Sequence, residues 1–348
     1  MLPLRSILSV MSILVIQLVV GLSTYTNADD QAYIRQGEVE RPNVVFIFCD
    51  DLGWGDLSCY GQQRYKTPNC DRLAKEGMLF TQFYVGGSVC SPSRTAIMTG
   101  HYPARHGVHG HFADVATNEK RGMPNWLDAD VTMLPDILKK AGYTTGHFGK
   151  WHLGYAAWSK ADAPSPDEYG IDTWRIADAA DWNLWSPAMR PQSTQLILEE
   201  TLKFIKENKD RPFYVNAWLL DTHATLNPTD EQLAVMERFK PKGVRFNGAT
   251  QIYYSAVAEV DKQIGMLMDE LKKLGIADNT IVILSSDNGP EEIEIGNAAH
   301  SGVGSAGPFR GRKRSLYEGG VRLPFIVRWP NGTPAGKIDD STVIGGVD

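Results

Sequence analysis

Short apolar runs alternate with amphipathic helical patterns along most of this chain. The first run, 43–49, is too short and too rich in β-branched residues to favour a helix, so it is predicted to be a buried strand. Further strands are predicted at 143–148, 213–220 and 280–286. Because neighbouring parallel strands need a crossover connection, usually a helix, this alternation predicts an α/β protein. Its central sheet should be mostly parallel, with helices on both faces.

Three helical patterns carry apolar residues on one face. They begin near Thr132 and end before Gly142, span 194–208, and span 251–274. Apolar residues at helical spacing are typical of a face that packs on a core, so no chemistry is assigned to them. The residues expected to face inward are Leu134, Ile137, Leu138, Ala141, Leu198, Leu202, Ile205, Val257, Val260, Ile264, Leu267, Leu271 and Leu274. The segments expected to be loops are 107–130, 156–191 and 291–307.

The composition is that of an ordinary globular protein with a mild negative charge. Its 348 residues are 43% apolar and 22% charged, which is enough for a large core in one big domain or two smaller ones. The net charge of -6 argues against nucleic acid as a partner. Any anionic substrate must therefore be bound by a local cluster of cations.

The first residues are typical of a secretory signal. Arg5 supplies the positive start, an apolar run follows to Leu22, and a small-residue cleavage site ends at Ala28. The predicted organisation is a signal peptide at 1–28, a linker at 29–40 and a catalytic domain at 41–348. Export is therefore expected, to a secreted or periplasmic location, or to the secretory pathway or lysosome of a eukaryote. The alternative is an uncleaved membrane anchor, through which alone membrane contact is expected.

Polar side chains follow three of the predicted strands, at 50–51, 221–223 and 287–289. The carboxyl ends of parallel strands share one rim of a sheet, where ligands bind. That rim would bring together an acidic, oxygen-only set that consists of Asp50, Asp51, Asp287 and Asn288. Crowded carboxylates repel one another without a cation, and oxygen ligands indicate calcium or magnesium over zinc. Taken alone, such residues more often cap helices and form turns after strands.

A cysteine stands beside a predicted helix start in the sequence Cys-Ser-Pro-Ser-Arg at 90–94. Ser91 suits the N-cap position and Pro92 the first helical position. The unpaired amides of a helix start favour a sulfate or phosphate, so Cys90 and Arg94 are candidates for anion chemistry. A lone cysteine in this setting can equally be a small buried core residue. Among the other cysteines, Cys59 and Cys70 could pair, but their spacing does not require it.

Two further segments concentrate positive charge. In an extended segment at 148–154, alternation would place Lys150 and His152 on one side and Trp151 on the other. The run 310–314 holds four cations in five residues, among them Lys313. Taken alone, Lys150 and His152 are better explained as a surface lysine beside a structural histidine, and the run 310–314 can be a solvated basic loop.

In combination, these motifs resemble the type I sulfatases. The form Cys-x-Pro-Ser-Arg at 90–94 resembles the family's first signature, and Gly-Lys-Trp-His-Leu-Gly at 149–154 resembles its second. Asp-Asp, Asp-Asn-Gly and Lys-x-x-x-Tyr-Glu-Gly-Gly stretches also occur in family order, at 50–51, 287–289 and 313–320. The resemblance implies an alkaline-phosphatase-like α/β fold. It also implies a smaller C-terminal domain, which this sequence would lack or hold incompletely.

The resemblance implies a chemistry for residue 90. In that family the cysteine is oxidised to formylglycine by a maturation enzyme, so Cys90 would become an aldehyde hydrate. One of its hydroxyls would attack the sulfur of a sulfate ester, and the other would later collapse the adduct to expel sulfate. One calcium ion would be bound by Asp50, Asp51, Asp287 and Asn288 together with residue 90. Asp287 is the implied base for the attacking hydroxyl.

Roles for the cations follow from the same resemblance. Arg94, Lys150 and Lys313 would balance charge on the sulfuryl oxygens, and Lys150, Lys313 and His223 would contact the substrate. His152 would hydrogen-bond the formylglycine hydroxyl and act as the base when the adduct collapses. His223 with Lys313 would protonate the departing alcohol. His223 departs from the family pattern, because His-Ala-Thr stands where His-x-Pro is common.

The expected substrate is a sulfated small molecule or glycan, most simply a carbohydrate sulfate. Export favours this substrate class, and Arg310, Arg312 and Arg314 could hold further anionic groups. Two alternatives remain open: a phosphonate or phosphodiester hydrolase of the same superfamily, and an inactive secreted relative that binds glycans. A hydrolase that uses the thiol of Cys90 directly would leave the acidic set unexplained.

Overall fold

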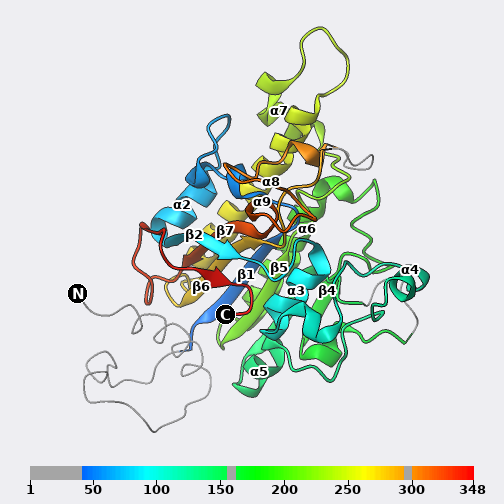
Figure 1. Ribbon diagram of the computed structural model, residues 1–348. Coiled ribbons are helices and arrows are strands. Elements are labelled where there is room, and N and C mark those ends of the chain that lie inside the picture. Colours follow the sequence, from blue (N-terminus) through cyan, green and yellow to red (C-terminus); the bar gives the residue numbers. More distant parts are fainter. Residues whose placement is uncertain (1–40, 155–161, 294–299) are drawn as a thin grey trace.

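A computed structural model describes residues 41–154, 162–293 and 300–348, so the predicted signal peptide and linker lie outside the described residues. The described part contains a nine-stranded sheet of order β4-β3-β5-β1-β6-β7-β2-β8, in which β9 also pairs with β2 (Figure 1). The strands are β1 Asn43–Cys49, β2 Met78–Tyr84, β3 Thr144–Gly149, β4 Thr173–Ile176, β5 Phe213–Trp218, β6 Thr280–Ser286, β7 Arg322–Arg328, β8 Lys337–Asp339 and β9 Ile344–Gly345.

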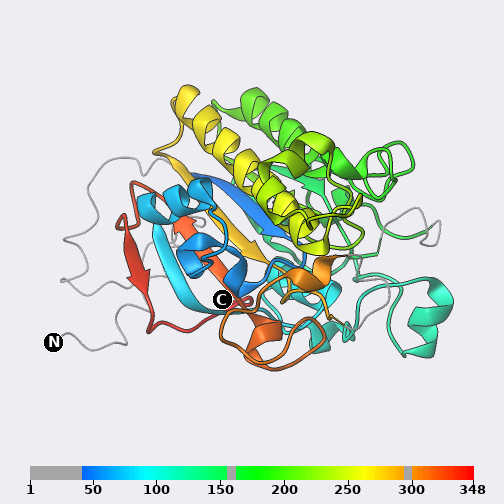
Figure 2. The ribbon, with the colours of Figure 1, turned by 90° about the horizontal axis from the view of Figure 1, so that it is seen from above.

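Helices cover both faces of this sheet, and Figure 2 shows α6 and α8 side by side over one of them. The α-helices are α2 Pro68–Glu76, α3 Cys90–Thr99, α4 Val115–Lys120, α5 Leu134–Lys140, α6 Ser193–Asn208, α7 Asp230–Val235, α8 Ala249–Lys273 and α9 Glu318–Val321. Short 3-10 helices lie at Trp54–Asp56, Ser58–Tyr60, Pro103–His106, Pro166–Tyr169, Arg190–Gln192, Glu237–Phe239 and Ser301–Val303. None of the helices in the described ranges is both long and apolar enough to span a membrane.

The central strand β1 is buried on both faces and separates two cores. Val45 and Ile47 pack in the core that contains the inner faces of α6 and α8. Phe46 and Phe48 pack on the opposite face with Met98 of α3. Because both faces are covered, the strand is a continuous apolar run and not an alternating one.

The predicted α/β architecture is confirmed. Strand β1 pairs in parallel with β5 and β6, and β3 pairs in parallel with β4 and β5. The two antiparallel pairings both involve β7, with β6 on one side and β2 on the other. The predicted strands 43–49 and 280–286 match β1 and β6 at both ends. Strands β3 and β5 differ from their predicted ranges by one or two residues at an end.

Two helix predictions are wrong in detail. Helix α3 begins at Cys90 with Val89 at the N-cap position, because Ser91 Oγ accepts a hydrogen bond from the backbone N–H of Phe112 at 2.9 Å and does not cap the helix. Ile137, expected to face inward, is 44% exposed. Helix α5 is only seven residues long and buries Pro135 and Leu138 instead.

Several elements were not expected from the sequence. The predicted loops 107–130 and 156–191 contain α4 and β4, and strands β2, β7, β8 and β9 were not anticipated. Strand β7 contains Pro324, which argues against a strand in an apolar run. The register of its partner β2 shifts between Phe80 and Phe83, opposite that proline, and such an irregularity tolerates the missing N–H. The pairing of Cys59 with Cys70 does not form, since both thiols are free.

Candidate active site

Three adjacent strands deliver the candidate residues to one rim of the sheet. Strands β5, β1 and β6 are neighbours in the sheet. His223 follows the end of β5, Asp50 follows β1 and Asp287 follows β6. Backbone bonds continue across these ends, from Thr222 N to Asp50 O at 2.8 Å and from Asp287 N to Cys49 O at 3.1 Å. The separate polar segments therefore converge at one rim of the sheet, as predicted.

The acidic residues at this rim form a compact buried cluster. Asp50, Asp51 and Asp287 each offer a carboxylate oxygen within 4.8 Å of the others. Asn288 Nδ2 donates to Asp51 Oδ1 at 2.7 Å, whereas the buried Asn288 Oδ1 has no hydrogen-bond partner among the described residues. Oxygen ligands with an unsatisfied buried carbonyl fit a hard divalent cation such as calcium or magnesium.

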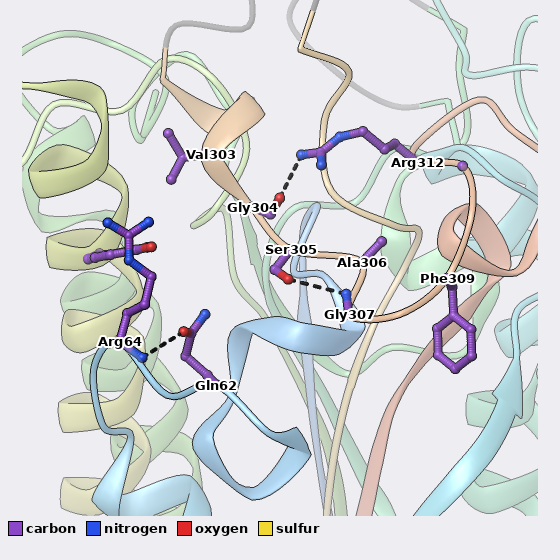
Figure 3. Close-up of a pocket in the computed structure, with 11 residues that line it drawn as sticks. Gln62, Arg64, Val303, Gly304, Ser305, Ala306, Gly307, Phe309 and Arg312 are labelled. Atoms are coloured by element: carbon purple, nitrogen blue, oxygen red, sulfur yellow. Dashed lines mark hydrogen bonds between the residues drawn. The ribbon is translucent and has the colours of Figure 1, made fainter.

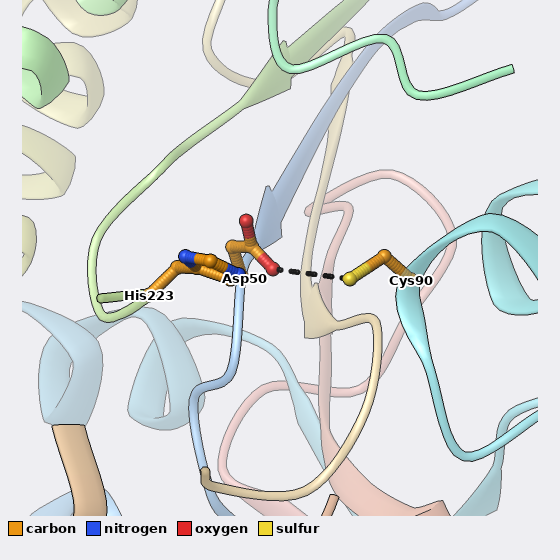
Figure 4. A group of neighbouring side chains, drawn as sticks. All are labelled: Asp50, Cys90 and His223. Atoms are coloured by element: carbon orange, nitrogen blue, oxygen red, sulfur yellow. Dashed lines mark hydrogen bonds between the residues drawn. The ribbon is translucent and has the colours of Figure 1, made fainter. Parts of the chain in front are cut away.

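Cys90 lies against this cluster at the first residue of α3. Its Sγ is 3.9 Å from Asp50 Oδ1, and His223 approaches the same carboxylate from another segment (Figure 4). Burial raises the pKa of the Cys90 thiol to about 11, despite the opposing charges of Lys150 and Lys313. An unmodified Cys90 is therefore a protonated thiol near neutral pH and a weak nucleophile.

Lys150 and Lys313 are buried beside the carboxylates. Lys150 Nζ donates to Asp50 Oδ2 at 2.6 Å. Lys313 Nζ donates to both oxygens of Asp51, at 2.6 and 2.8 Å. Both positive charges are near enough to Cys90 to oppose the rise in its pKa, and an anionic substrate at that position would require such cations.

Arg94 is fully buried, and its donors are committed to protein groups. Its Nη2 and Nε donate to Asp287 Oδ2 at 2.7 and 3.2 Å, and its Nη1 donates to Lys150 O at 3.2 Å. The guanidinium also lies 4.9 Å from the ring centroid of Trp218. These contacts orient Asp287 and the Lys150 backbone, so the geometry favours a positioning role for Arg94 over direct contact with a sulfuryl group.

The two candidate histidines have defined tautomers. His152 Nε2 donates to Phe112 O at 2.9 Å, which leaves Nδ1 as the basic nitrogen. His223 Nδ1 donates to Ala224 O, and its Nε2 lies 3.9 Å from Asp51 Oδ2. Burial holds the pKa of both rings well below the ordinary histidine value, which favours the neutral form of each ring near neutral pH.

The carboxylates divide into two electrostatic types. Burial raises the pKa of Asp51, and burial together with the charge of Asp50 raises the pKa of Asp287 to about 6. Burial acts on Asp50 in the same direction, but Lys150 and the other nearby cations hold its pKa well below the ordinary value. The raised pKa values expected from crowding therefore occur at Asp51 and Asp287 but not at Asp50.

A family model described as Sulfatase matches residues 42–344, which is most of this chain. The chain belongs to the sulfatase family. An N-acetylgalactosamine-6-sulfatase of Rattus norvegicus is 34% identical over 340 residues, covering 88% of this sulfatase chain and 60% of the relative. An arylsulfatase of Hemicentrotus pulcherrimus is 32% identical, covering 86% of this chain and 56% of the relative. The chain thus spans about three fifths of the length of these curated relatives.

A solved structure shares the fold of this sulfatase. The structure of Ps i-CgsB in complex with k-i-k-neocarrahexaose has a TM-score of 0.73 and 27% sequence identity, and the match covers 88% of this chain and 70% of that chain. The likeness agrees with the alkaline-phosphatase-like fold that the motifs implied.

Three residues of the candidate site that are not glycine have a left-handed backbone conformation. These are Asp51, His152 and Arg314, with φ of 63°, 56° and 71°. Such conformations cost energy and concentrate where a side chain must be aimed at a particular point. The conformation of His152 also corrects the sequence prediction, because β3 ends at Gly149 and the segment 150–152 does not continue as an extended strand.

The arginines of the basic run have three different environments in this sulfatase. Arg312 donates to the backbone oxygens of Glu291, Gly302 and Gly304, and thereby fixes a loop. Arg310 stacks on a tyrosine ring. Arg314 forms an ion pair with the buried Glu291 and remains 41% exposed. Of the three, Arg314 combines an exposed guanidinium with an ion pair to a residue that lies beside Lys313.

Sequence reasoning missed several residues beside the site. Glu291 pairs with Arg314 and lies 3.7 Å from Lys313 Nζ. Two features of the sequence could have indicated Glu291: it directly follows Asp-Asn-Gly-Pro, and the basic run 310–314 needs an acidic partner. Trp185 and Arg190 contact the His223 segment, but no motif marks them in the sequence.

A separate pocket of about 500 Å³ lies beside Arg312, and Figure 3 shows Arg64 and Arg312 approaching its space from opposite sides. Its other lining residues are Gln62, Tyr254, Val303, Gly304, Ser305, Ala306, Gly307, Phe309 and Gly311. None of the candidate catalytic residues of this sulfatase lines it. The pocket is therefore distinct from the buried cluster at the rim of the sheet.

Proposed function

We propose that this protein hydrolyses sulfate esters at the site built around residue 90. The observation that carries the proposal is the convergence of Cys90, three buried carboxylates and two buried lysines at one rim of the sheet. A thiol alone does not account for this arrangement, because burial keeps Cys90 protonated. A modified, metal-assisted nucleophile accounts for both the carboxylates and the lysines.

Asp50, Asp51, Asp287 and Asn288 would hold a calcium ion, and residue 90 would be present as formylglycine. When present, formylglycine hydrate supplies the oxygen nucleophile, and the ion supplies charge compensation for the sulfate group. The fit of the ion rests on the clustered carboxylates and on the unsatisfied Asn288 Oδ1. The fit of formylglycine rests on the position of Cys90 at the start of α3, against Asp50.

Side chains of the site would bind the sulfate group and transfer the protons. Lys150 and Lys313 bind and orient the sulfate group, since their ammonium groups flank the cluster. Arg94 holds Asp287 in place, and Asp287 accepts the proton of the attacking hydroxyl. His152 offers Nδ1 as a proton acceptor, because its Nε2–H is committed to a backbone carbonyl.

His223 is proposed to donate the proton that the departing alcohol takes. Its Nδ1–H is fixed on Ala224 O, so Nε2 is the nitrogen that faces the carboxylates and the substrate. Burial lowers the pKa of this ring and thereby favours its neutral form. A bound sulfate anion would favour the protonated ring, and Lys313 beside it would stabilise the leaving oxygen.

The proposed substrate class is a sulfated carbohydrate. This choice is supported by relatives named N-acetylgalactosamine-6-sulfatase and by a related structure described with k-i-k-neocarrahexaose. The exposed guanidinium of Arg314 beside the site supports a substrate with a further anionic group. Export through residues 1–28 and conversion of Cys90 by a maturation enzyme belong to the same proposal.

Initial rates of product release test the function directly. The purified protein is expected to hydrolyse an aryl sulfate faster than an aryl phosphate diester, and Cys90→Ala is expected to abolish the reaction. Cys59→Ala is the matched control, because Cys59 is a free thiol outside this cluster. Faster cleavage of the diester would favour a phosphodiesterase. No reaction with either compound, from protein whose residue 90 carries an aldehyde, would favour a glycan-binding relative.

A further inference from the structure

Arg190 is a buried arginine whose hydrogen bonds converge on the segment that carries His223. The side chain is 3% exposed and belongs to the 3-10 helix Arg190–Gln192 just before α6. Its Nη2 donates to His223 O at 2.7 Å and to Leu220 O at 3.2 Å, and its Nε donates to Thr225 O at 3.1 Å. Three carbonyls within six residues of chain are therefore held by one planar guanidinium.

The remaining contacts of Arg190 fix the guanidinium itself. Its Nη1 donates to Asp221 Oδ1 at 2.8 Å and to Ser193 Oγ at 2.7 Å. Asp221 is held in turn, because its Oδ2 accepts from Thr194 Oγ1 at 2.6 Å. A lysine has only one nitrogen and no rigid fork, so it cannot reproduce this set of bonds.

Trp185 completes the support of the His223 ring. The edge-on contact between the two rings has a centroid separation of 5.3 Å. The same indole lies 5.5 Å from the Arg190 guanidinium and 5.6 Å from Lys150 Nζ. His223 is thus fixed through its backbone by Arg190 and through its ring by Trp185.

This support determines which nitrogen of His223 faces the reacting groups. The Nδ1–H of His223 is donated to Ala224 O. Ala224 stands in the sequence between His223 and Thr225, whose backbone carbonyls both accept hydrogen bonds from Arg190. If those carbonyls move, the acceptor for Nδ1–H moves with them. We propose that Arg190 is a positioning residue that aims Nε2 of His223 at the oxygen of the leaving alcohol. The proposal rests on the sulfatase function proposed above.

Substrates with different leaving groups distinguish this positioning role of Arg190 from general structural support. A sugar alcohol is a poor leaving group, so its departure needs the proton that His223 supplies. A nitrophenolate departs without that help. Loss of Arg190 should therefore resemble loss of His223: a large effect on sugar sulfates and a small one on nitrophenyl sulfate.

The test compares kcat/KM of Arg190→Lys and His223→Gln on a monosaccharide 6-sulfate and on nitrophenyl sulfate. Both variants are expected to lose about a hundredfold or more in kcat/KM on the sugar sulfate and much less on nitrophenyl sulfate. The double variant should lose no more than His223→Gln alone, since the two residues act through one proton donor. Arg175→Lys is the control, because Arg175 is a half-exposed arginine paired with Glu200 away from this segment.

Asp221→Asn provides a second variant in case Arg190→Lys does not fold. The substitution weakens the contact between Asp221 and the Arg190 guanidinium. It should therefore also reduce kcat/KM more on the sugar sulfate than on nitrophenyl sulfate, but by a smaller factor than Arg190→Lys. Equal losses on both substrates, or wild-type rates in these variants while His223→Gln is selectively impaired, would overturn the role of Arg190. A wild-type protein that cleaves neither sulfate would instead overturn the proposed function.

Discussion

Lys313 places its Nζ 2.6 Å from one carboxylate oxygen of Asp51 and 2.8 Å from the other, although the two residues are 262 positions apart. Both side chains are almost completely buried. The contact joins the end of β1 to the basic run after residue 309. It therefore ties the fold of the late part of the chain to the rim of the sheet where the reaction is proposed to occur.

Lys313→Met is expected to lower the free energy of unfolding by about 3–5 kcal/mol, because it leaves the Asp51 carboxylate buried without its partner. Urea denaturation in the presence of a chelator measures this effect without compensation by a bound cation. Lys337→Met is the control, since Lys337 is an exposed residue of β8. Equal midpoints for wild type and Lys313→Met would mean that the ion pair has no role in stability.

Calcium should stabilise the folded protein through the acidic cluster. At about a hundredfold excess over the dissociation constant, one bound ion contributes about 2.7 kcal/mol, which thermal unfolding can detect. Asn288→Leu removes the unsatisfied amide oxygen and should reduce the calcium-induced increase in Tm. The exposed Asn227→Leu should leave that increase unchanged. An identical calcium response in Asn288→Leu would argue against Asn288 as a ligand.

Arg314→Gln should raise KM about tenfold for a polysulfated oligosaccharide, through loss of one charge-assisted contact, and much less for a monosulfated sugar. The expectation follows from the exposed face of a guanidinium that is close enough to the cluster to interact with the charge of Asp51. Arg310→Gln is the matched control, because Arg310 lies 4.0 Å from the Tyr317 ring centroid. Similar KM changes on both substrates would refute the contact.

His147 should make the fold sensitive to acid. Burial lowers its pKa from 6.5 to about 3, and the ring packs edge-on against Trp151 and Trp218 at 4.9 Å. Between those values the unfolded chain binds the proton and the folded chain does not, so stability falls as pH falls. When the pH falls from about 7.5 to about 5, His147 should lower the free energy of unfolding by about 2 kcal/mol.

His147→Phe should remove that part of the pH dependence of unfolding, whereas the exposed His109→Phe should not. Denaturant titrations at the two pH values measure the difference. If the acid sensitivity of His147→Phe equals that of wild type, His147 does not account for it.

The sheet could be predicted where burial dictates composition. The sequence predicts both ends of β1 and β6 correctly, because central strands that are covered on both faces are short continuous apolar runs. Strand β7 was missed because Pro324 breaks the pattern, and its tolerance depends on an irregularity in β2 that no local sequence reveals. Strand β4 has only four residues, Thr173–Ile176, with too little alternation to recognise.

The site was predictable where motif residues follow strand ends. Asp50, Asp51, Asp287 and Asn288 fall at one rim because parallel strands share their direction. Arg190 was not predictable, because its partners are mostly backbone carbonyls, which carry no sequence signal. The inward orientation of Arg312 has the same origin, since only the folded loop presents the carbonyls that it binds.

Residue 90 is proposed to act as an oxidised cysteine within this cluster. Mass spectrometry of the peptide that contains residue 90, with and without an aldehyde-trapping reagent, tests this proposal in preparations of different specific activity. The fraction of residue 90 present as aldehyde is predicted to rise in proportion to the rate of aryl sulfate hydrolysis. A fully active preparation in which residue 90 is still a thiol would contradict the account.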